Sequence, residues 1–469
     1  MKKTFTRAIA ALAGFVALTT SAQAGADEAR AVHFIPKNNA LGDVHPFFEN
    51  GTYYLFYLKP GEFESALVTS TNLLEWSEVN LRHTAGASDE WLRPYYVLGV
   101  FRDHLTGAYR SYYGCRNRMV GSSSTNLIEW SSAPPNESVP DQPDRYERQR
   151  DPYVFWNESE RRYGCVMTCR LRNVPEARAG AVGYATSADL KTWQPVKDLF
   201  FPGDIGEPEC PQLFPIGVRW YLLASIYDRA VGKPSYWVSD APTGPWQTRK
   251  PSSLDGKDLC AAQVGFDGRR WLLFGWIPLT ASQPGRQHWG GHLALPREVV
   301  QNADGSLSAR LEPGVGAGIR GERVFALGAP RTVAAESGGT LALPSDLGPF
   351  DVETEFRVTR GCQRCGLRLG EPFRVVVDFE KQLLAVEGPA GETVADLPVA
   401  VAPDSVRHLR VVVDGDIVEA FLDDRYSLAA RLPQNVSHAP SSLFVQSGSV
   451  TFEAVRVHRL KAVVRRIQP

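Results

Sequence analysis

Short apolar runs, interrupted by turn residues every few positions, dominate the chain from residue 40 to residue 300. The run YYLFY (53–57) follows Asn50-Gly51, and the run WLLF (271–274) follows Asp267-Gly268. Asn-Gly and Asp-Gly next to apolar runs are strong signals of a β-hairpin. The same region shows no long helical period. The pattern therefore predicts an all-β chain.

A motif that opens with serine and closes with tryptophan recurs along this region. It reads STNLLEW at 70–76, STNLIEW at 124–130, SADLKTW at 187–193 and, more loosely, SDAPTGPW at 239–246. The copies recur about every 50 to 60 residues, a period typical of propeller blades. Five units of three or four short strands predict a five-bladed β-propeller over residues 30–312.

An acidic residue precedes an aromatic, β-prone run in three of these units. The acids are Asp43 in GDVHPFF (42–48), Asp151 in RDPYVFW (150–156) and Glu209 in PECPQLF (208–214). They stand near unit starts, as Gly99 and Ala262 do in the other two units. The first strand of every blade runs beside the propeller axis, so residues at equivalent early positions converge at one end of the channel. The sequence therefore predicts one pocket that contains three carboxylates.

Period-2 alternation of apolar and polar residues marks the C-terminal third of the chain. A Gly-, Ala- and Pro-rich stretch precedes it, and we expect residues 313–340 to be a linker with an entering strand. Residues 341–469 contain short alternating runs, for example at 352–358, and a turn at Asp414-Gly415-Asp416. Short strands at close spacing with hairpin turns predict a β-sandwich.

The N-terminus has the composition of a secretory signal. Lys2 and Lys3 precede an apolar run at 8–18, and AQA at 22–24 has the pattern of a cleavage site. We therefore expect residues 1–24 to be a signal peptide and the mature protein to be secreted or periplasmic. No later apolar run approaches the roughly 20 residues that cross a bilayer, so no membrane span is expected.

Charge and cysteine content narrow the possible partners. The 51 basic and 52 acidic residues give no signal for a polyanion, so nucleic acid is not an expected partner. Seven cysteines include two close pairs, Cys165 with Cys169 and Cys362 with Cys365, and each pair is spaced to close a short disulfide loop. Neither pair has a histidine at ligand spacing, which disfavours zinc. The odd count leaves a free thiol, and Cys210 is a candidate for a buried one.

Two carboxylates on either side of a glycosidic bond are the usual groups for its hydrolysis, one ionised and one protonated. Crowding of three acids disfavours ionisation, so we expect Glu209 to hold its proton longer. Arg150 precedes Asp151, but neighbouring strand residues face opposite sides, so the two need not pair. The spacing leaves open whether the reaction retains or inverts configuration. No Asp-rich calcium loop is present, so a metal is not expected, and the absence of a Gly-x-Ser-x-Gly motif disfavours a Ser-His-Asp hydrolase.

Taken together, the motifs resemble those of glycoside hydrolase family 32, the β-fructofuranosidases. The similarity extends over the whole mature chain, with RDP at 150–152, ECP at 209–211, FGW at 274–276, LPRE at 295–298 and LRVVVDGDIVEAFLDD at 409–424. The resemblance implies a five-bladed propeller followed by a β-sandwich. It also implies an oligosaccharide or polysaccharide substrate with β-fructofuranosyl linkages, and a retaining mechanism without a cofactor.

The resemblance also assigns roles to matching positions. Asp43 would be the nucleophile, Glu209 the general acid/base and Asp151 the stabiliser of the transition state. The expected substrate contacts are Arg150, His45, Cys210, Trp276 and Trp289.

One motif departs from the family pattern. The usual Asn-Asp-Pro-Asn-Gly is here GDVHP (42–46), so both asparagines that would touch the sugar are absent, and His45 stands in place of the second. His45 is either a sugar contact or a structural residue. The alternatives left open are hydrolysis of another furanoside such as an arabinofuranoside, fructosyl transfer to an acceptor sugar, and a non-catalytic sugar-binding propeller. The oligomeric state is also open.

Overall fold

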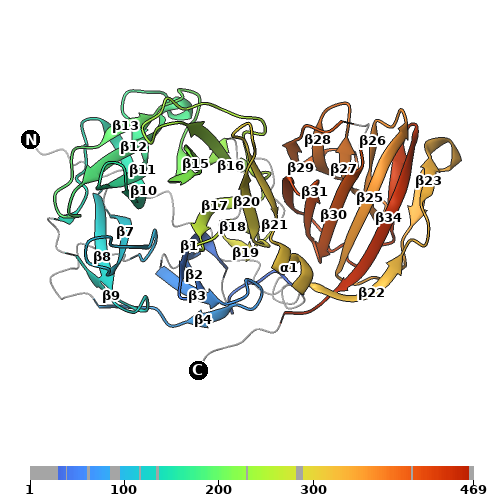
Figure 1. Cartoon of the computed structure of the whole chain (residues 1–469), viewed down its shortest axis with the longest axis horizontal. Coiled ribbons are helices and arrows are strands. Elements are labelled where there is room, and N and C mark those ends of the chain that lie inside the picture. Colours follow the sequence, from blue (N-terminus) through green and yellow to red (C-terminus); the bar gives the residue numbers. More distant parts are fainter. Residues whose placement is uncertain are drawn as a thin grey trace, which may run out of the picture.

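The computed structural model describes residues 30–37, 40–60, 64–84, 96–115, 118–133, 137–228, 231–280, 289–402 and 405–463. These residues form seven β-sheets, five in an N-terminal ring and two in a C-terminal pair (Figure 1). The stretch 1–24, expected to be a signal peptide, lies outside the described residues. Within the described ranges, no helix combines the length and the apolar character that a membrane crossing requires.

The five N-terminal sheets are the blades of a β-propeller, as predicted. Blade I contains β1 (Gly42–Glu49), β2 (Thr52–Lys59), β3 (Glu64–Ser70) and β4 (Ser77–Val79). Blade II contains β6 (Phe101–Arg102), β7 (Tyr109–Cys115), β8 (Arg118–Ser124) and β9 (Glu129–Ser132), with β5 (Arg82–Thr84) parallel to β9. Blade III contains β10 (Tyr146–Asn157), β11 (Arg162–Leu171), the short η4 helix (Glu176–Arg178), β12 (Gly180–Ser187) and β13 (Lys197–Phe200).

The last two blades complete the ring. Blade IV contains β14 (Pro208–Ile216), β15 (Arg219–Asp228) and β16 (Val231–Ser239). Blade V contains β17 (Cys260–Phe266), β18 (Trp271–Pro278), β20 (Arg297–Gln301) and β21 (Leu307–Leu311), and β19 (Gly291–Leu293) also pairs with β18.

The repeated serine–tryptophan motif forms the turn after the third strand of a blade. In blade I, Ser70 Oγ accepts the N–H of Leu73 at 2.9 Å, and Leu73 has a φ of 66°. Asn72 Oδ1 accepts the N–H of Glu75 at 2.9 Å. Such side-chain bonds to nearby backbone replace ladder bonds and favour a turn. Blades II and III repeat the geometry, and all three closing tryptophans are buried: Trp76, Trp130 and Trp193.

The two C-terminal sheets share one large hydrophobic core and form the predicted β-sandwich. One sheet contains β22 (Arg320–Ala326), β23 (Arg331–Ala334), β25 (Phe350–Arg360), β30 (Arg407–Asp414), β31 (Ile417–Leu422), β32 (Tyr426–Arg431) and β34 (Ser449–Leu460). The other contains β24 (Thr340–Ala342), β26 (Arg364–Leu369), β27 (Phe373–Asp378), β28 (Leu383–Glu387), β29 (Thr393–Pro398) and β33 (Ser441–Gln446).

The stretch 313–340, expected to be a linker with one entering strand, has more structure than that. It begins with the short helix α1 (Pro313–Gly318), and it supplies both β22 and β23 to the sandwich before the turn η5 (Ala335–Ser337). Both strands pair with β34, which is long enough for β22 and β23 to pair with different parts of it. In Figure 1, α1 and β22 mark the passage from the propeller to the sandwich.

Two of the sequence motifs lie where the propeller meets the sandwich. Arg297, in LPRE, is buried and forms an ion pair with Glu419 of β31 and another with Asp255 at 3.1 Å. Glu419 also accepts the N–H of Leu295 at 2.9 Å. These bonds satisfy charges that would be costly to bury alone. The motifs therefore help to join the two parts of the chain.

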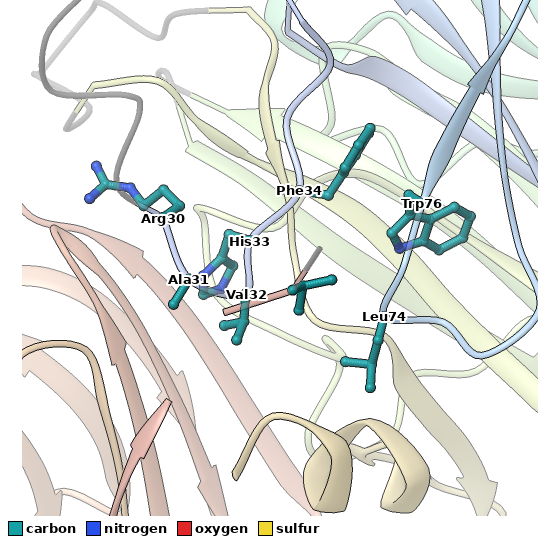
Figure 2. A pocket seen from close by; sticks show the side chains of 8 residues that line it. Arg30, Ala31, Val32, His33, Phe34, Leu74 and Trp76 are labelled. Atoms are coloured by element: carbon teal, nitrogen blue, oxygen red, sulfur yellow. The ribbon is translucent and has the colours of Figure 1, made fainter. Parts of the chain in front are cut away.

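The segment before blade I crosses the same boundary. The N–H groups of Ala31 and Val32 donate to the Asp414 carboxylate at 2.8 and 2.9 Å. Figure 2 shows this segment beside the sandwich strands, with a small cavity of about 20 Å³ near it. The residues that line the cavity include Val32 and Phe34 of this segment and Leu74 and Trp76 from the turn after β3 of blade I.

All seven cysteines are free and buried. The expected loop between Cys165 and Cys169 is wrong, because the two lie four residues apart on the extended strand β11. At about 3.3 Å per residue, their Cα atoms are too far apart for a disulfide. Cys362 and Cys365 are likewise free thiols, although a hydrogen bond joins their side chains. Cys210 is buried and free, as expected.

Candidate active site

The inner strand of each blade has a residue with a left-handed backbone, either within the strand or just before it. The ladders of β1, β10, β14 and β17 shift register next to these residues, as at a β-bulge. A positive φ is uncommon in residues other than glycine, and residues held in such conformations outside turns cluster at functional sites. The bulges therefore redirect the side chains at one end of the axis. The φ values are 40° at Asp43, 56° at Gly99, 52° at Asp151, 49° at Cys210 and 42° at Ala261.

The bulges correct the predicted register of blade IV. Cys210, and not Glu209, occupies the position that corresponds to Asp43 and Asp151. Glu209 is the last paired residue before its bulge and so corresponds to Arg150. The sequence could not reveal this offset of one residue, because the distance along the chain from one repeat unit to the next varies by more than one residue.

Arg150 joins two of the three acids. Its Nη2 lies 2.7 Å from Oε1 of Glu209, and its Nη1 donates to Oδ2 of Asp151. The pair between Arg150 and Asp151 forms although the residues are neighbours, because the bulge breaks the alternation of a regular strand. Such charge-assisted bonds are among the strongest hydrogen bonds in proteins.

Asp151 is fixed by further hydrogen-bonding groups. Its Oδ2 accepts the N–H of Cys210 at 3.2 Å and lies 3.2 Å from Thr168 Oγ1. The Thr168 hydroxyl also lies 2.8 Å from the carbonyl oxygen of Pro208. Sequence reasoning missed Thr168; the signal that could have found it is its place opposite Arg150 in the β10–β11 hairpin.

Asp43 is the acid with the largest change in proton affinity. Burial is the main cause that raises its pKa to about 7, and the negative charges of Asp151 and Glu209 raise it further. The charge of Arg150 and a hydrogen bond with the Trp289 side chain oppose these effects. The three acids are therefore close enough to influence one another, as the repeat predicted.

Glu209 also binds its proton more tightly than an exposed glutamate. Burial raises its pKa, and the charges of Asp151 and Glu207 add to this effect. The charge of Arg150 and its hydrogen bond to the carboxylate act in the opposite direction. A carboxyl in these surroundings is suited to general acid catalysis.

Trp289 is held beside Asp43 by backbone pairing. Gly291 and Leu41 exchange two backbone hydrogen bonds, of 2.8 and 3.0 Å, which place the start of β19 next to β1. A Cβ atom on Gly42 would lie 2.8 Å from the Trp289 ring, so glycine at this position leaves room for the indole. Trp289 is 38% exposed, which leaves part of its ring open to a ligand.

Three of the expected substrate contacts have buried side chains. His45 Nδ1 accepts the N–H of Gly99 at 3.1 Å, and burial lowers the pKa of His45 to about 3, so its ring is neutral. Burial raises the pKa of the Cys210 thiol. Trp276 is 1% exposed and belongs to the same buried cluster as Cys210. These three side chains are buried beneath the site and are not open to a ligand. The Arg150 side chain, in contrast, is 26% exposed.

Within the described ranges, no group of three or more His, Cys, Asp or Glu side chains is arranged to hold a metal ion.

Comparison with protein families matches both parts of the chain. Residues 33–310 match the model described as "Glycosyl hydrolases family 32 N-terminal domain", and residues 329–459 match "Glycosyl hydrolases family 32 C terminal". Among curated proteins, the chain is similar to "Beta-fructofuranosidase, insoluble isoenzyme 3" from Oryza sativa, with 25% identity over 325 residues. That alignment covers 58% of this chain and 55% of the relative. The chain thus spans about half the length of the curated relatives it matches.

Solved structures share the fold at low identity. The exo-inulinase from Aspergillus awamori superposes with a TM-score of 0.72 and 18% identity, covering 93% of this chain and 99% of that one. Fructan 1-exohydrolase IIa from Cichorium intybus superposes with a TM-score of 0.74 and 16% identity, covering 94% and 98%. The two family models together cover most of this chain, in the order propeller then sandwich. The chain belongs to glycosyl hydrolase family 32.

Proposed function

We propose that this chain is a secreted hydrolase that cleaves β-fructofuranosyl linkages in fructans or fructo-oligosaccharides with retention of configuration. The observation that carries the proposal is the convergence of Asp43, Asp151 and Glu209 around Arg150. Two carboxylic acids of different proton affinity are the usual catalytic residues of a glycosidase. Family membership supports the same class of reaction.

The substrate class is supported by the proteins that this chain resembles. The printed titles of two similar structures describe fructan 1-exohydrolase IIa in complex with 1-kestose and a fructofuranosidase from Schwanniomyces occidentalis in complex with fructosylnystose. Both ligands are fructose-containing oligosaccharides. The secreted location rests on the N-terminal sequence 1–24.

In the proposed mechanism, Asp43 attacks the anomeric carbon of the fructosyl unit and forms a covalent ester. Glu209 donates its proton to the leaving oxygen and then removes a proton from the water that hydrolyses the ester. Arg150 and the N–H of Cys210 hold the Asp151 carboxylate in place. It accepts hydrogen bonds from sugar hydroxyls, and these strengthen as positive charge develops on the ring. No cofactor takes part.

The proposal is tested by incubating the chain with sucrose, inulin, levan and an aryl arabinofuranoside. We expect fructose release from at least one fructoside, and Asp43→Ala and Glu209→Ala each lower kcat by about 10²-fold or more with the fold retained. Retention is tested by NMR, with β-fructofuranose as the first product. Near-normal activity of either variant would refute the site. Turnover of the arabinofuranoside alone, or product of inverted configuration, would refute the substrate or the mechanism.

A further inference from the structure

Glu207 lies two residues before Glu209 and faces a group of three arginines. Its carboxylate oxygens lie 3.4 Å from Arg148 Nη1, 3.5 Å from Arg150 Nη2 and 3.7 Å from Arg170 Nη2. The Glu207 side chain is only 15% exposed, so solvent screens these interactions less than on an open surface. One carboxylate thus holds three positive charges beside the candidate acid.

Arg150 uses the same nitrogen for both glutamates. Its Nη2 lies 2.7 Å from Glu209 and 3.5 Å from Glu207. A guanidinium directed only at Glu209 would favour the ionised carboxylate and so remove the proton that a general acid needs. A second carboxylate that attracts the same nitrogen weakens this effect.

We propose that Glu207 is a positioning residue that shares Arg150 with Glu209 and thereby keeps Glu209 able to protonate the leaving group. The inference rests on the proposed role of Glu209. It assigns a function to an acidic side chain near the site that the three-acid arrangement leaves unused.

Charges of both signs surround Glu209. Glu209 faces Arg150 and Asp151 on β10, Asp43 on β1 and Glu207 on the approach to its own strand. The charge of Glu207 raises the pKa of Glu209. Removing it would end that repulsion and leave Arg150 to Glu209 alone. It would also remove the carboxylate that pairs with Arg148, so the positive charge of Arg148 would no longer be compensated there. All three effects lower the pKa of Glu209.

The test is the pH dependence of kcat/KM for a fructoside, whose two limbs report the ionisations of the essential carboxyl groups of the free enzyme. The limb that belongs to Glu209 is the one whose midpoint agrees with the titration of Glu209 followed by NMR. We expect Glu207→Gln to move the midpoint of this limb to lower pH by about half a unit to one unit, the size expected for one charge at several ångströms in partly hydrated protein. The midpoint does not depend on the height of the plateau. If Glu207 had a purely structural role, Glu207→Gln would lower the maximum value of kcat/KM and leave the midpoint of the limb unchanged.

Two variants serve as controls. Glu207→Asp keeps the charge, so its midpoint should stay near that of the wild type. Glu176→Gln removes a carboxylate that pairs with the same Arg170, at 3.1 Å, but its side chain is 79% exposed and it has no contact with Arg150 among the described residues. Its midpoint should not move. The inference is overturned if Glu207→Gln leaves the midpoint unchanged or raises it, or if either control shifts it equally.

A second readout does not depend on turnover. Carbon-13 NMR of the free protein, labelled at the side-chain carboxyl of glutamate, follows the titration of Glu209, whose resonance is identified by its loss in Glu209→Gln. We expect Glu207→Gln to lower this titration midpoint by a similar amount, and an unchanged midpoint would overturn the inference. If the NMR shift occurs but no fructoside is hydrolysed, the proposed function fails while the coupling between Glu207 and Glu209 is supported.

Discussion

His33 Nε2 lies 2.8 Å from Oε1 of Glu419, which joins the segment before the first blade to the sandwich. Its other ring nitrogen, Nδ1, lies 2.9 Å from Oδ2 of Asp414, and all three side chains are buried. Ionised carboxylates only accept hydrogen bonds, so both ring nitrogens donate and the ring is an imidazolium. Burial lowers the pKa of His33, but the bonds to the two carboxylates and their charges outweigh it and raise the pKa overall.

We expect His33→Asn to lower the free energy of unfolding by about 3 kcal/mol at pH 6, because buried Asp414 loses the imidazolium and buried Glu419 keeps only its ion pair with Arg297. A raised pKa in the folded state means that this stabilisation is fully present below the unfolded pKa near 6.5 and is lost as pH rises through the folded pKa. The difference from the wild type should therefore shrink above pH 7. Urea unfolding at pH 6 and at pH 9 measures it.

The control for this prediction is His438→Asn. His438 also pairs with a carboxylate, Asp346, at 2.7 Å, but the two side chains are 67% and 81% exposed. Exposed pairs contribute little, so no measurable change is expected. Equal stability of His33→Asn and the wild type at pH 6 would contradict a stabilising ion pair between His33 and the two carboxylates.

Asp43→Asn should stabilise the protein while it abolishes turnover. The pKa of Asp43 is raised to about 7, so the native state binds this proton more tightly than the unfolded chain does. Its contribution to stability is fully present below about pH 4 and is lost as pH rises through 7. We expect Asp43→Asn to be more stable than the wild type by about 1 to 3 kcal/mol at pH 8, with no difference near pH 4.

Thermal melting at both pH values measures the effect of Asp43→Asn. Asp240→Asn is the control, since the Asp240 side chain is 89% exposed and should not change stability at either pH. A variant less stable than the wild type at pH 8 would mean that Asp43 is not held in unfavourable surroundings.

Gly42→Ala should displace the Trp289 indole, because the added Cβ would lie 2.8 Å from its ring. Moving the indole breaks its hydrogen bond with Asp43 and shifts a side chain next to the reacting centre. We expect kcat/KM to fall by about 10- to 100-fold, as small misplacements near the chemistry often cost this much. Steady-state kinetics on a fructoside measures it. Gly328→Ala is the control, since a Cβ there meets nothing within 4 Å. Equal kinetics for both variants would show that the contact has no role.

Thr168→Val should reduce both activity and stability. It removes the hydroxyl whose single proton is within reach of the Pro208 carbonyl at 2.8 Å and of Asp151 at 3.2 Å, and a buried acceptor that loses its donor costs about 1 to 3 kcal/mol. We expect kcat to fall by about 10-fold, because Asp151 loses one of the groups that orient it. Thr354→Val is the matched control: Thr354 is 1% exposed and its hydroxyl has no hydrogen-bond partner among the described residues. It should be as stable as the wild type or more so, and a larger loss there than at Thr168 would contradict this account.

Much of the fold follows from the sequence alone. The turn at Ser70 and the equivalent turns in other blades are held by hydrogen bonds between residues two or three positions apart. The motif therefore predicts the end of the third strand of a blade wherever it occurs. The alternation in β25 likewise predicts which side chains enter the sandwich core, for example Val352 and Phe356. Local turn chemistry and strand periodicity need no distant partner, which is why the propeller and the sandwich could be predicted.

The site depended partly on tertiary structure. The sequence indicated that Asp43, Asp151 and Glu209 belong together, because repeat position determines which strand end each occupies. It could not determine the one-residue offset of Glu209 or the pairing of Arg150 across two blades, because the bulges form only when each inner strand pairs with its neighbour. Nor could it place Trp289 or His33, whose partners are brought near by closure of the ring and by docking of the sandwich. Contacts between residues far apart in the chain depend on the packed whole, and no local pattern records them.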